Sequence, residues 1–86
     1  MSSAVPDVII YTTRFCGYCV RAKMLLRDRG IPYREVDVSG DAAARSALIA
    51  QTGRYTVPQI FIDGQPIGGF QELAAMDRQG GLRAAS

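Results

Sequence analysis

The 86-residue chain has ten Lys and Arg residues, eight Asp and Glu residues, no His and two Cys, which gives a formal net charge of +2. This length suits one domain with a single hydrophobic core, so we treat residues 1–86 as one domain. The net charge is small and the basic residues are scattered rather than clustered, so the charge does not favour a nucleic-acid partner. No segment approaches the ~20 apolar residues of a membrane span, and the first residues do not resemble a secretion signal. We therefore expect no membrane partner and a cytoplasmic protein.

The first two predicted elements are a strand and a helix. Residues 7–12 alternate and are rich in β-branched side chains, which predicts a strand. No proline interrupts residues 16–29, which predicts a helix that Gly30 ends. This helix has two apolar faces, so we expect it to pack against both a sheet and a neighbouring helix. One face carries Cys19, Ala22, Leu25 and Leu26, the other carries Val20 and Met24, and the basic residues Arg21, Lys23, Arg27 and Arg29 are expected to face solvent.

The middle of the chain predicts a second strand and a second helix. Pro32 opens an extended run over residues 33–38, which is the predicted strand. Asp41 is a residue type that caps helices, and the helix is expected over residues 42–52 with Gly53 closing it. A right-handed crossover through the first helix sets the first two strands parallel.

The second half of the chain begins with a predicted β-hairpin. Residues 57–62 and 65–68 are its strands, and Asp63-Gly64 suits the type I′ turn that joins antiparallel strands. Pro66 has no backbone N–H to donate, so its strand is expected at an edge of the sheet.

The last predicted element is a helix over residues 70–78, which Gly80 and Gly81 end before a free polar tail. The elements then follow the order β-α-β-α-β-β-α. This order predicts an α/β fold in which three helices flank a four-stranded mixed sheet.

Both cysteines lie where the first strand gives way to the first helix, in the segment Cys16-Gly17-Tyr18-Cys19. Two cysteines this close in sequence cannot close a long loop, so a structural disulfide between them would stabilise the fold little. A Cys-x-x-Cys motif that follows a strand at the start of a β-α-β unit is typical of thioredoxin-like redox proteins. We therefore predict that this pair makes and breaks disulfides.

Three segments, taken in their order along the chain, carry a family resemblance. They are Ile10-Tyr11-Thr12 with the Cys-x-x-Cys motif, residues 56–64 (Thr-Val-Pro-Gln-Ile-Phe-Ile-Asp-Gly), and Ile67-Gly68-Gly69. The chain resembles the glutaredoxins, and most closely the small bacterial single-domain dithiol class. The resemblance implies a thioredoxin-like fold and a thiol–disulfide oxidoreductase that uses glutathione. The chain departs from the family pattern at three positions, where Gly17 replaces a Pro, Thr13 replaces a Lys, and Gln71, next to Glu72, replaces an Asp.

Within this resemblance, Cys16 is the predicted nucleophile and Cys19 the resolving thiol. The species that attacks in thiol–disulfide exchange is the thiolate. A helix N-terminus alone stabilises a thiolate too little, so we expect the N–H groups of Tyr18 and Cys19, the Cys19 thiol and a cation such as Arg14 to contribute. A Cys-His pair is excluded because the chain has no His. The Tyr18 ring either covers the exposed sulfur, stacks on the substrate or fills space beside the helix.

The resemblance also implies a glutathione site on the hairpin side of the cysteines. Pro58 resembles the cis-proline of the family, which would turn the backbone N–H and C=O of Val57 outward to pair with glutathione like an added β-strand. Gly68 and Gly69 would let the ligand approach the backbone closely.

The two carboxylates of glutathione need separate partners. Free N–H groups of Phe70 and Gln71 at a helix start suit the γ-glutamyl carboxylate. The glycyl carboxylate needs a cation, for which Arg54 is the first candidate and Arg45 the second. The predicted glutathione-binding residues are Arg14, Tyr18, Arg54, Thr56, Val57, Pro58, Gly69, Phe70 and Gln71.

Two functions follow from these residues. The first is an enzyme, monomeric by default, whose partners are glutathione and glutathionylated or disulfide-containing proteins. The alternative is a [2Fe–2S] protein in which Cys16 and glutathione from each of two monomers supply the four thiolates. Gly17 favours this alternative as an added property, because similar glutaredoxins that lack the motif proline sometimes bind clusters. A mononuclear zinc site lacks enough ligands in this sequence.

Overall fold

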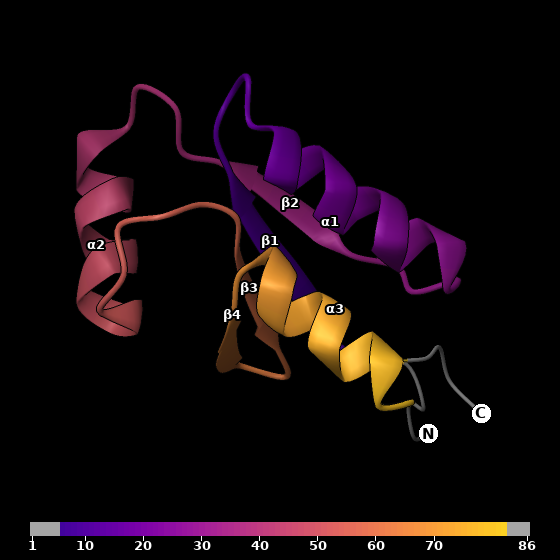
Figure 1. Cartoon of the computed structure of the whole chain (residues 1–86). Helices are drawn as coiled ribbons and strands as arrows, with labels where there is room; N and C mark the ends of the chain where they lie inside the picture. Colours follow the sequence, from indigo (N-terminus) through magenta and orange to yellow (C-terminus); the bar gives the residue numbers. More distant parts are fainter. Residues whose placement is uncertain (1–5, 83–86) are drawn as a thin grey trace.

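The computed structural model describes residues 6–82, and its helices and strands follow the predicted order β-α-β-α-β-β-α (Figure 1). Among these residues, no helix has the length and hydropathy needed to cross a bilayer. The elements are β1 (Val8–Thr12), α1 (Gly17–Asp28), β2 (Arg34–Asp37), α2 (Ala42–Thr52), β3 (Gln59–Ile62), β4 (Gln65–Gly68) and α3 (Phe70–Arg78).

The four strands form one mixed sheet in the order β2-β1-β3-β4. β1 pairs parallel with β2 and antiparallel with β3, and β3 pairs antiparallel with β4. These pairings confirm the predicted mixed sheet and hairpin, and Pro66 lies in the edge strand β4 as expected. Asp63 and Gly64 join β3 to β4 with φ angles of 52° and 81°, and a type I′ turn requires positive φ at both positions.

The helix ends follow from local backbone chemistry. α1 begins at Gly17, one residue later than predicted, because Cys16 is its N-cap. α2 begins after Asp41, whose carboxylate accepts the Ala44 N–H at 3.0 Å. The chain leaves α1 through Gly30, which has a left-handed φ of 71°. The caps predicted from sequence therefore mark the helix ends to within about two residues.

α1 and α3 pack against each other, and Figure 1 shows α2 away from this pair. The Arg29 guanidinium in the turn after α1 donates to both oxygens of the Asp77 carboxylate in α3, at 2.6 and 2.8 Å. Arg29 therefore joins the two helices, whereas the sequence predicted that it would only face solvent. The core beneath them contains Val8, Ile10, Ala22, Leu26, Ile31, Ile60, Leu73 and Leu82.

The second apolar face predicted for α1 is not covered. Val20 and Met24 expose 51% and 47% of their surface. The reason is that the sheet and α3 both contact the opposite face of α1, through Ala22 and Leu26. The helix therefore packs against the sheet and α3 as predicted, but through one face, and the prediction of a second packed face is wrong.

The chain that follows α3 turns back onto the core. Gly81 donates its N–H to the Met76 carbonyl at 2.8 Å, and Leu82 is only 6% exposed. The free polar tail predicted after Gly81 is therefore wrong at residue 82, because an apolar side chain at that position completes the core. The rest of the predicted tail, residues 83–86, lies outside the described residues.

Candidate active site

Cys16 lies at the N-terminal end of α1, where the chain turns after β1. The preceding residue, Phe15, has a left-handed φ of 57° and a fully exposed side chain. Cys16 Sγ accepts the Cys19 N–H at 3.1 Å and lies 3.8 Å from the Val57 carbonyl oxygen. The thiol is free and partly exposed. The helix N–H groups and the positive end of the helix dipole therefore favour negative charge on this sulfur.

Cys19 lies one helical turn further along and is buried, with 2% of its surface exposed. Burial raises the pKa of its thiol to about 12, and a hydrogen bond with Cys16 adds to this shift. The backbone of Thr13 and the charge of Lys23 act in the opposite direction and lower the same pKa. Near neutral pH Cys19 is therefore protonated, which suits a thiol that acts only after Cys16 has reacted.

A groove of about 270 Å³ lies on the Val57 side of Cys16. Three parts of the chain that are far apart in sequence line it, namely the start of α1, the segment before β3 and the start of α3. Eight of the nine residues predicted to bind glutathione are in this lining, and Arg14 is the exception. The lining residues are Tyr18, Arg54, Thr56, Val57, Pro58, Gly69, Phe70, Gln71 and Glu72.

The floor of the groove depends on a close approach between Pro58 and the glycine pair that precedes α3. The Val57-Pro58 peptide bond is cis, as the family resemblance implies. A β-carbon at Gly69 would lie 3.1 Å from the Pro58 carbonyl oxygen. A β-carbon at Gly68, where φ is +112°, would lie 2.8 Å from Glu72 Cγ. Glycine at both positions therefore lets α3 begin directly against the Pro58 loop.

Glu72 is a groove residue that the sequence analysis missed. Its Oε1 accepts the Gly69 N–H at 2.7 Å, and its Oε2 lies 3.6 Å from Arg54 Nη1. The Gly69 hydrogen bond lowers the pKa of this carboxyl below its usual value, and a hydrogen bond from the Glu72 backbone and the Arg54 charge act in the same direction. Glu72 therefore brings a negative charge to the groove near neutral pH. Its place three residues after the N-cap Gly69 is the spacing of a capping box, and that spacing was the available signal.

The two arginine candidates for a ligand carboxylate have different positions. Arg54 lines the groove, whereas Arg45 is not part of the lining. Arg45 instead donates to the Tyr55 carbonyl oxygen at 2.6 Å. The guanidinium of Arg54 is thus the one placed to meet a carboxylate in the groove.

Tyr18 forms the rim of the groove between α1 and α3. Its ring centroid lies 6.0 Å from that of Phe70, and the Arg21 guanidinium carbon lies 5.5 Å from the Tyr18 centroid. Half of the Tyr18 surface remains exposed, at 53%. The ring therefore fills space between the helices and still presents an aromatic surface to a ligand.

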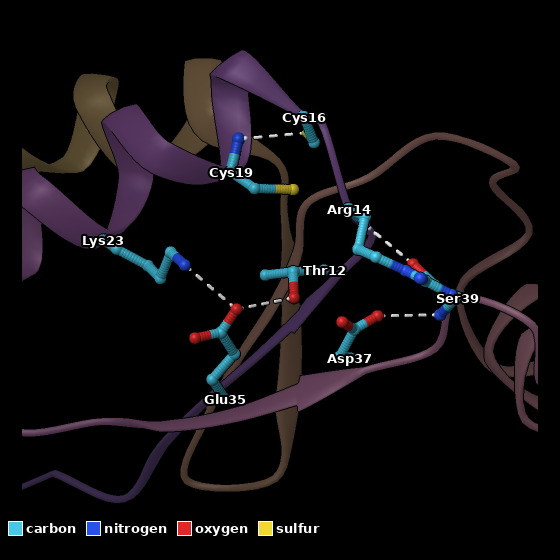
Figure 2. A network of polar contacts seen from close by, with 8 residues as sticks. All are labelled: Thr12, Arg14, Cys16, Cys19, Lys23, Glu35, Asp37 and Ser39. Carbon is cyan, nitrogen blue, oxygen red and sulfur yellow. Dashed lines mark hydrogen bonds and ion pairs between the residues drawn. The ribbon is translucent and has the colours of Figure 1, made fainter.

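A second cavity, of about 460 Å³, is lined by both cysteines and by residues that do not belong to the groove. Figure 2 shows the polar network at its wall: Lys23 Nζ lies 3.0 Å from Glu35 Oε2, and Thr12 Oγ1 donates to the same oxygen at 2.8 Å. Hydrogen bonding with Lys23 and then with Thr12 holds the pKa of the Glu35 carboxyl below its usual value. Lys23, predicted to face solvent, is therefore an ion-pair partner whose charge acts on buried Cys19.

Arg14 belongs to this second side of the site and not to the groove. Its backbone N–H donates to Ser39 Oγ at 2.7 Å, and Figure 2 shows its side chain extended toward Ser39 and Asp37. The Ser39 N–H in turn donates to Asp37 Oδ1 at 2.8 Å. The structure therefore does not bring Arg14 to Cys16 as a stabilising cation or to the groove as a ligand contact.

Comparison with known proteins identifies the family of the chain. The family model described as Glutaredoxin matches residues 8–67. The chain belongs to the glutaredoxin family. Glutaredoxin 3 from Escherichia coli (strain K12) is 51% identical to it over 76 residues, which cover 88% of this chain and 92% of that glutaredoxin. A glutaredoxin from Pseudomonas aeruginosa is 42% identical over 80 residues, with 93% and 95% covered.

Solved glutaredoxin structures share the fold. The crystal structure of a buckwheat glutaredoxin–glutathione complex gives a TM-score of 0.82 at 34% identity, and covers 90% of this chain and 73% of that chain. The holo form of glutaredoxin C1 from Populus tremula x tremuloides gives 0.82 at 35% identity, with 92% and 74% covered. These matches confirm the thioredoxin-like α/β fold. Together with the cysteine pair they make this glutaredoxin a thiol–disulfide oxidoreductase.

One chain of this glutaredoxin provides few ligands for a metal. Within residues 6–82, no three His, Cys, Asp or Glu side chains gather where they could hold a metal ion. Cys16 has a partly exposed sulfur, whereas Cys19 is buried. The predicted [2Fe–2S] alternative therefore needs thiolates from glutathione and from a second chain.

Proposed function

We propose that this glutaredoxin uses glutathione to reduce protein–glutathione mixed disulfides and, with both cysteines, protein disulfides. The observation that carries the proposal is the contrast between the two thiols, of which Cys16 lies next to the groove residue Val57. Cys16 is partly exposed and accepts a helix N–H, whereas Cys19 is buried with a raised pKa. We also propose a cytoplasmic location, where glutathione is kept reduced.

The groove offers a partner for each end of glutathione. Arg54 would meet the glycyl carboxylate, and the N–H groups at the start of α3 would meet the γ-glutamyl carboxylate. The Glu72 carboxylate would meet the γ-glutamyl ammonium, because it is the negative charge at that end of the groove. The Val57 backbone would pair with the cysteinyl part between them. The buckwheat glutaredoxin–glutathione complex, which shares the fold, supports a glutathione ligand.

Reduction of a glutathione mixed disulfide needs Cys16 alone. The Cys16 thiolate attacks the glutathione sulfur, the mixed disulfide breaks, and the protein thiolate leaves with the electron pair and takes a proton from solvent. This step forms a disulfide between Cys16 and glutathione. The thiolate of a second glutathione then attacks the glutathionyl sulfur, which releases glutathione disulfide and restores the Cys16 thiolate.

Reduction of a protein disulfide also needs Cys19. Cys16 first attacks one sulfur of the protein disulfide and forms a mixed disulfide with the protein. Cys19 then loses its proton and attacks Cys16 Sγ, so that the reduced protein leaves and a Cys16–Cys19 disulfide forms. Two glutathione molecules supply the two electrons that reduce this disulfide.

The two cysteine variants test this assignment. Cys16→Ser is expected to abolish reduction of a small glutathione mixed disulfide, measured by coupling glutathione disulfide formation to a reductase. Cys19→Ser is expected to keep a substantial part of that activity and to lose reduction of protein disulfides. Equal loss in both variants on the small mixed disulfide would contradict the proposed monothiol step.

A further inference from the structure

The segment over residues 54–58 supplies four of the groove-lining residues and belongs to no helix or strand. Side chains outside the groove hold its backbone. Thr52 Oγ1 accepts the Arg54 N–H at 3.2 Å, and Arg45 donates to the Tyr55 carbonyl oxygen at 2.6 Å. This part of the groove lining therefore depends on residues that do not line the groove themselves.

Gln59 is the most deeply placed of these residues. Its Nε2 donates to the Thr56 carbonyl oxygen at 2.8 Å and lies 3.3 Å from Thr56 Oγ1. Its side chain is 1% exposed and does not line the groove. Its backbone opens β3 and pairs with Tyr11 in the neighbouring strand β1, so Gln59 belongs to the hydrogen-bonded sheet. A buried amide held in this way has little freedom to move.

Gln59 is connected to the reacting sulfur of Cys16 through Thr56 and Val57. Thr56 is bonded in sequence to Val57, and the Val57 carbonyl oxygen lies 3.8 Å from Cys16 Sγ. We propose that Gln59 is a positioning residue, whose buried amide fixes Thr56 and, through it, the Val57 backbone that pairs with the cysteinyl part of glutathione. The proposal rests on the proposed function for the identity of the ligand.

Gln59→Met tests the proposal because it keeps an unbranched side chain of similar length and removes both hydrogen-bond donors. The expected result is a roughly tenfold rise in KM for a small glutathione mixed disulfide, with kcat changed by less than about twofold. Gln59→Glu, which has the same shape but whose carboxylate only accepts hydrogen bonds, is expected to raise KM in the same direction.

Ile60→Val is the matched control. Ile60 follows Gln59 in β3, is 0% exposed and belongs to the core, so this variant loses stability without touching Thr56. Its KM is expected to equal that of the unchanged protein. A Gln59→Met protein that is folded and whose KM equals that of Ile60→Val would overturn the proposal.

A measurement on the free protein separates this proposal from the proposed function. Amide ¹⁵N relaxation needs no glutathione, and the order parameters of Thr56 and Val57 are expected to fall in Gln59→Met toward flexible values below about 0.6. They are expected to stay unchanged in Ile60→Val. If the unchanged protein fails to reduce glutathione mixed disulfides, the proposed function is wrong. The order parameters still show whether Gln59 holds Thr56 and Val57 in place. Order parameters that do not change in Gln59→Met contradict this positioning role.

Discussion

The two sides of the cysteine pair are lined by different kinds of chemical groups. On the groove side, the lining comes from a loop and two helix starts, and it includes Gly69, which has only backbone, and Val57, whose carbonyl oxygen lies 3.8 Å from Cys16 Sγ. On the other side, the cavity wall includes a side-chain ion pair between α1 and β2, formed by Lys23 and Glu35. Backbone groups suit a peptide-like ligand, whereas a fixed charge acts on the protein's own thiol. Ligand recognition and disulfide resolution should therefore respond to different mutations.

The largest difference between the effects on ligand recognition and on disulfide resolution is expected from Arg54→Met on the groove side. This variant removes a charge-assisted hydrogen bond to a glutathione carboxylate, so KM for a glutathione mixed disulfide should rise about tenfold. The rise is limited because the Arg54 side chain is 45% exposed, so water and salt partly screen its charge. Steady-state kinetics at fixed ionic strength measure the change.

Arg34→Met is the matched control for Arg54→Met. Arg34 is also an exposed arginine in a loose ion pair, 3.3 Å from Asp7, but it lies outside the groove. Its KM is expected to stay within about twofold of the unchanged protein. A similar rise in both variants would show that net charge, and not a contact in the groove, sets the affinity.

Lys23→Met on the other side is expected to have a smaller effect, and to slow disulfide resolution while leaving ligand recognition unchanged. The Lys23 charge lowers the pKa of Cys19, which burial holds at about 12, so its loss raises that pKa further. Fewer Cys19 thiolates form at a given pH, so protein-disulfide reduction should slow about threefold to fivefold and its pH–rate profile should move to higher pH. Reduction of a small glutathione mixed disulfide, which needs only Cys16, should not change.

Two variants on the same helix sharpen the Lys23 result. Lys23→Arg keeps the charge and is expected to keep the pH–rate profile. Arg27→Met removes an exposed charge from α1 and is expected to leave both reactions unchanged. A profile that stays in place in Lys23→Met would mean that the ion pair has only a structural role.

The smallest effect is expected at Gly17, which lies between the two sides. Gly17 is the first residue of α1, where proline is favoured, and a β-carbon there would meet nothing within 4 Å. Cys16 has an extended backbone, with φ −109° and ψ 107°, which suits a residue before proline. Gly17→Pro should therefore stabilise the fold by about 0.4–1 kcal/mol, measured by urea unfolding, with mixed-disulfide reduction unchanged within about twofold.

The same variant tests the cluster hypothesis. Proline would restrict how Cys16 leans toward a metal shared between two chains, so Gly17→Pro is expected to suppress [2Fe–2S] binding. The unchanged protein is expected to become a coloured dimer only when iron, sulfide and glutathione are supplied together. A colourless monomer in that reconstitution removes the hypothesis.

Features that depend on residues near one another in sequence could be predicted. The type I′ turn at Asp63-Gly64 and the Asp41 cap each follow from a few adjacent residues, and the structure contains both. The residues of the groove come from three distant segments, and no periodicity joins them. They were predicted because the ordered motifs resemble a family whose fold brings Val57 and Gly69 together.

Features that depend on pairing between elements could not be predicted. Lys23 and Glu35 lie on different elements, and a basic residue on a helix surface gives no sign of its partner. The apolar pattern of α1 showed that Val20 and Met24 are hydrophobic but not that they would stay uncovered. The sequence gives no signal of the role of Gln59, because its contact with Thr56 depends on the backbone path across the cis Val57-Pro58 bond, which only the folded chain shows.

The crowding at the start of α3 has a consequence for how this chain can diversify. Any side chain at Gly68 meets Glu72, and shortening Glu72 would not help, because the backbone at Gly68 keeps a φ of +112° that other residues rarely adopt. Gly69 has an ordinary extended backbone with φ −103°, and the tightest contact of a β-carbon built there would be the Pro58 carbonyl oxygen at 3.1 Å. Libraries randomised at these two neighbouring positions should therefore give different active variants. Only glycine is expected at position 68. A small residue such as alanine is expected to be tolerated at position 69, where the Pro58 loop needs to move by only a few tenths of an ångström.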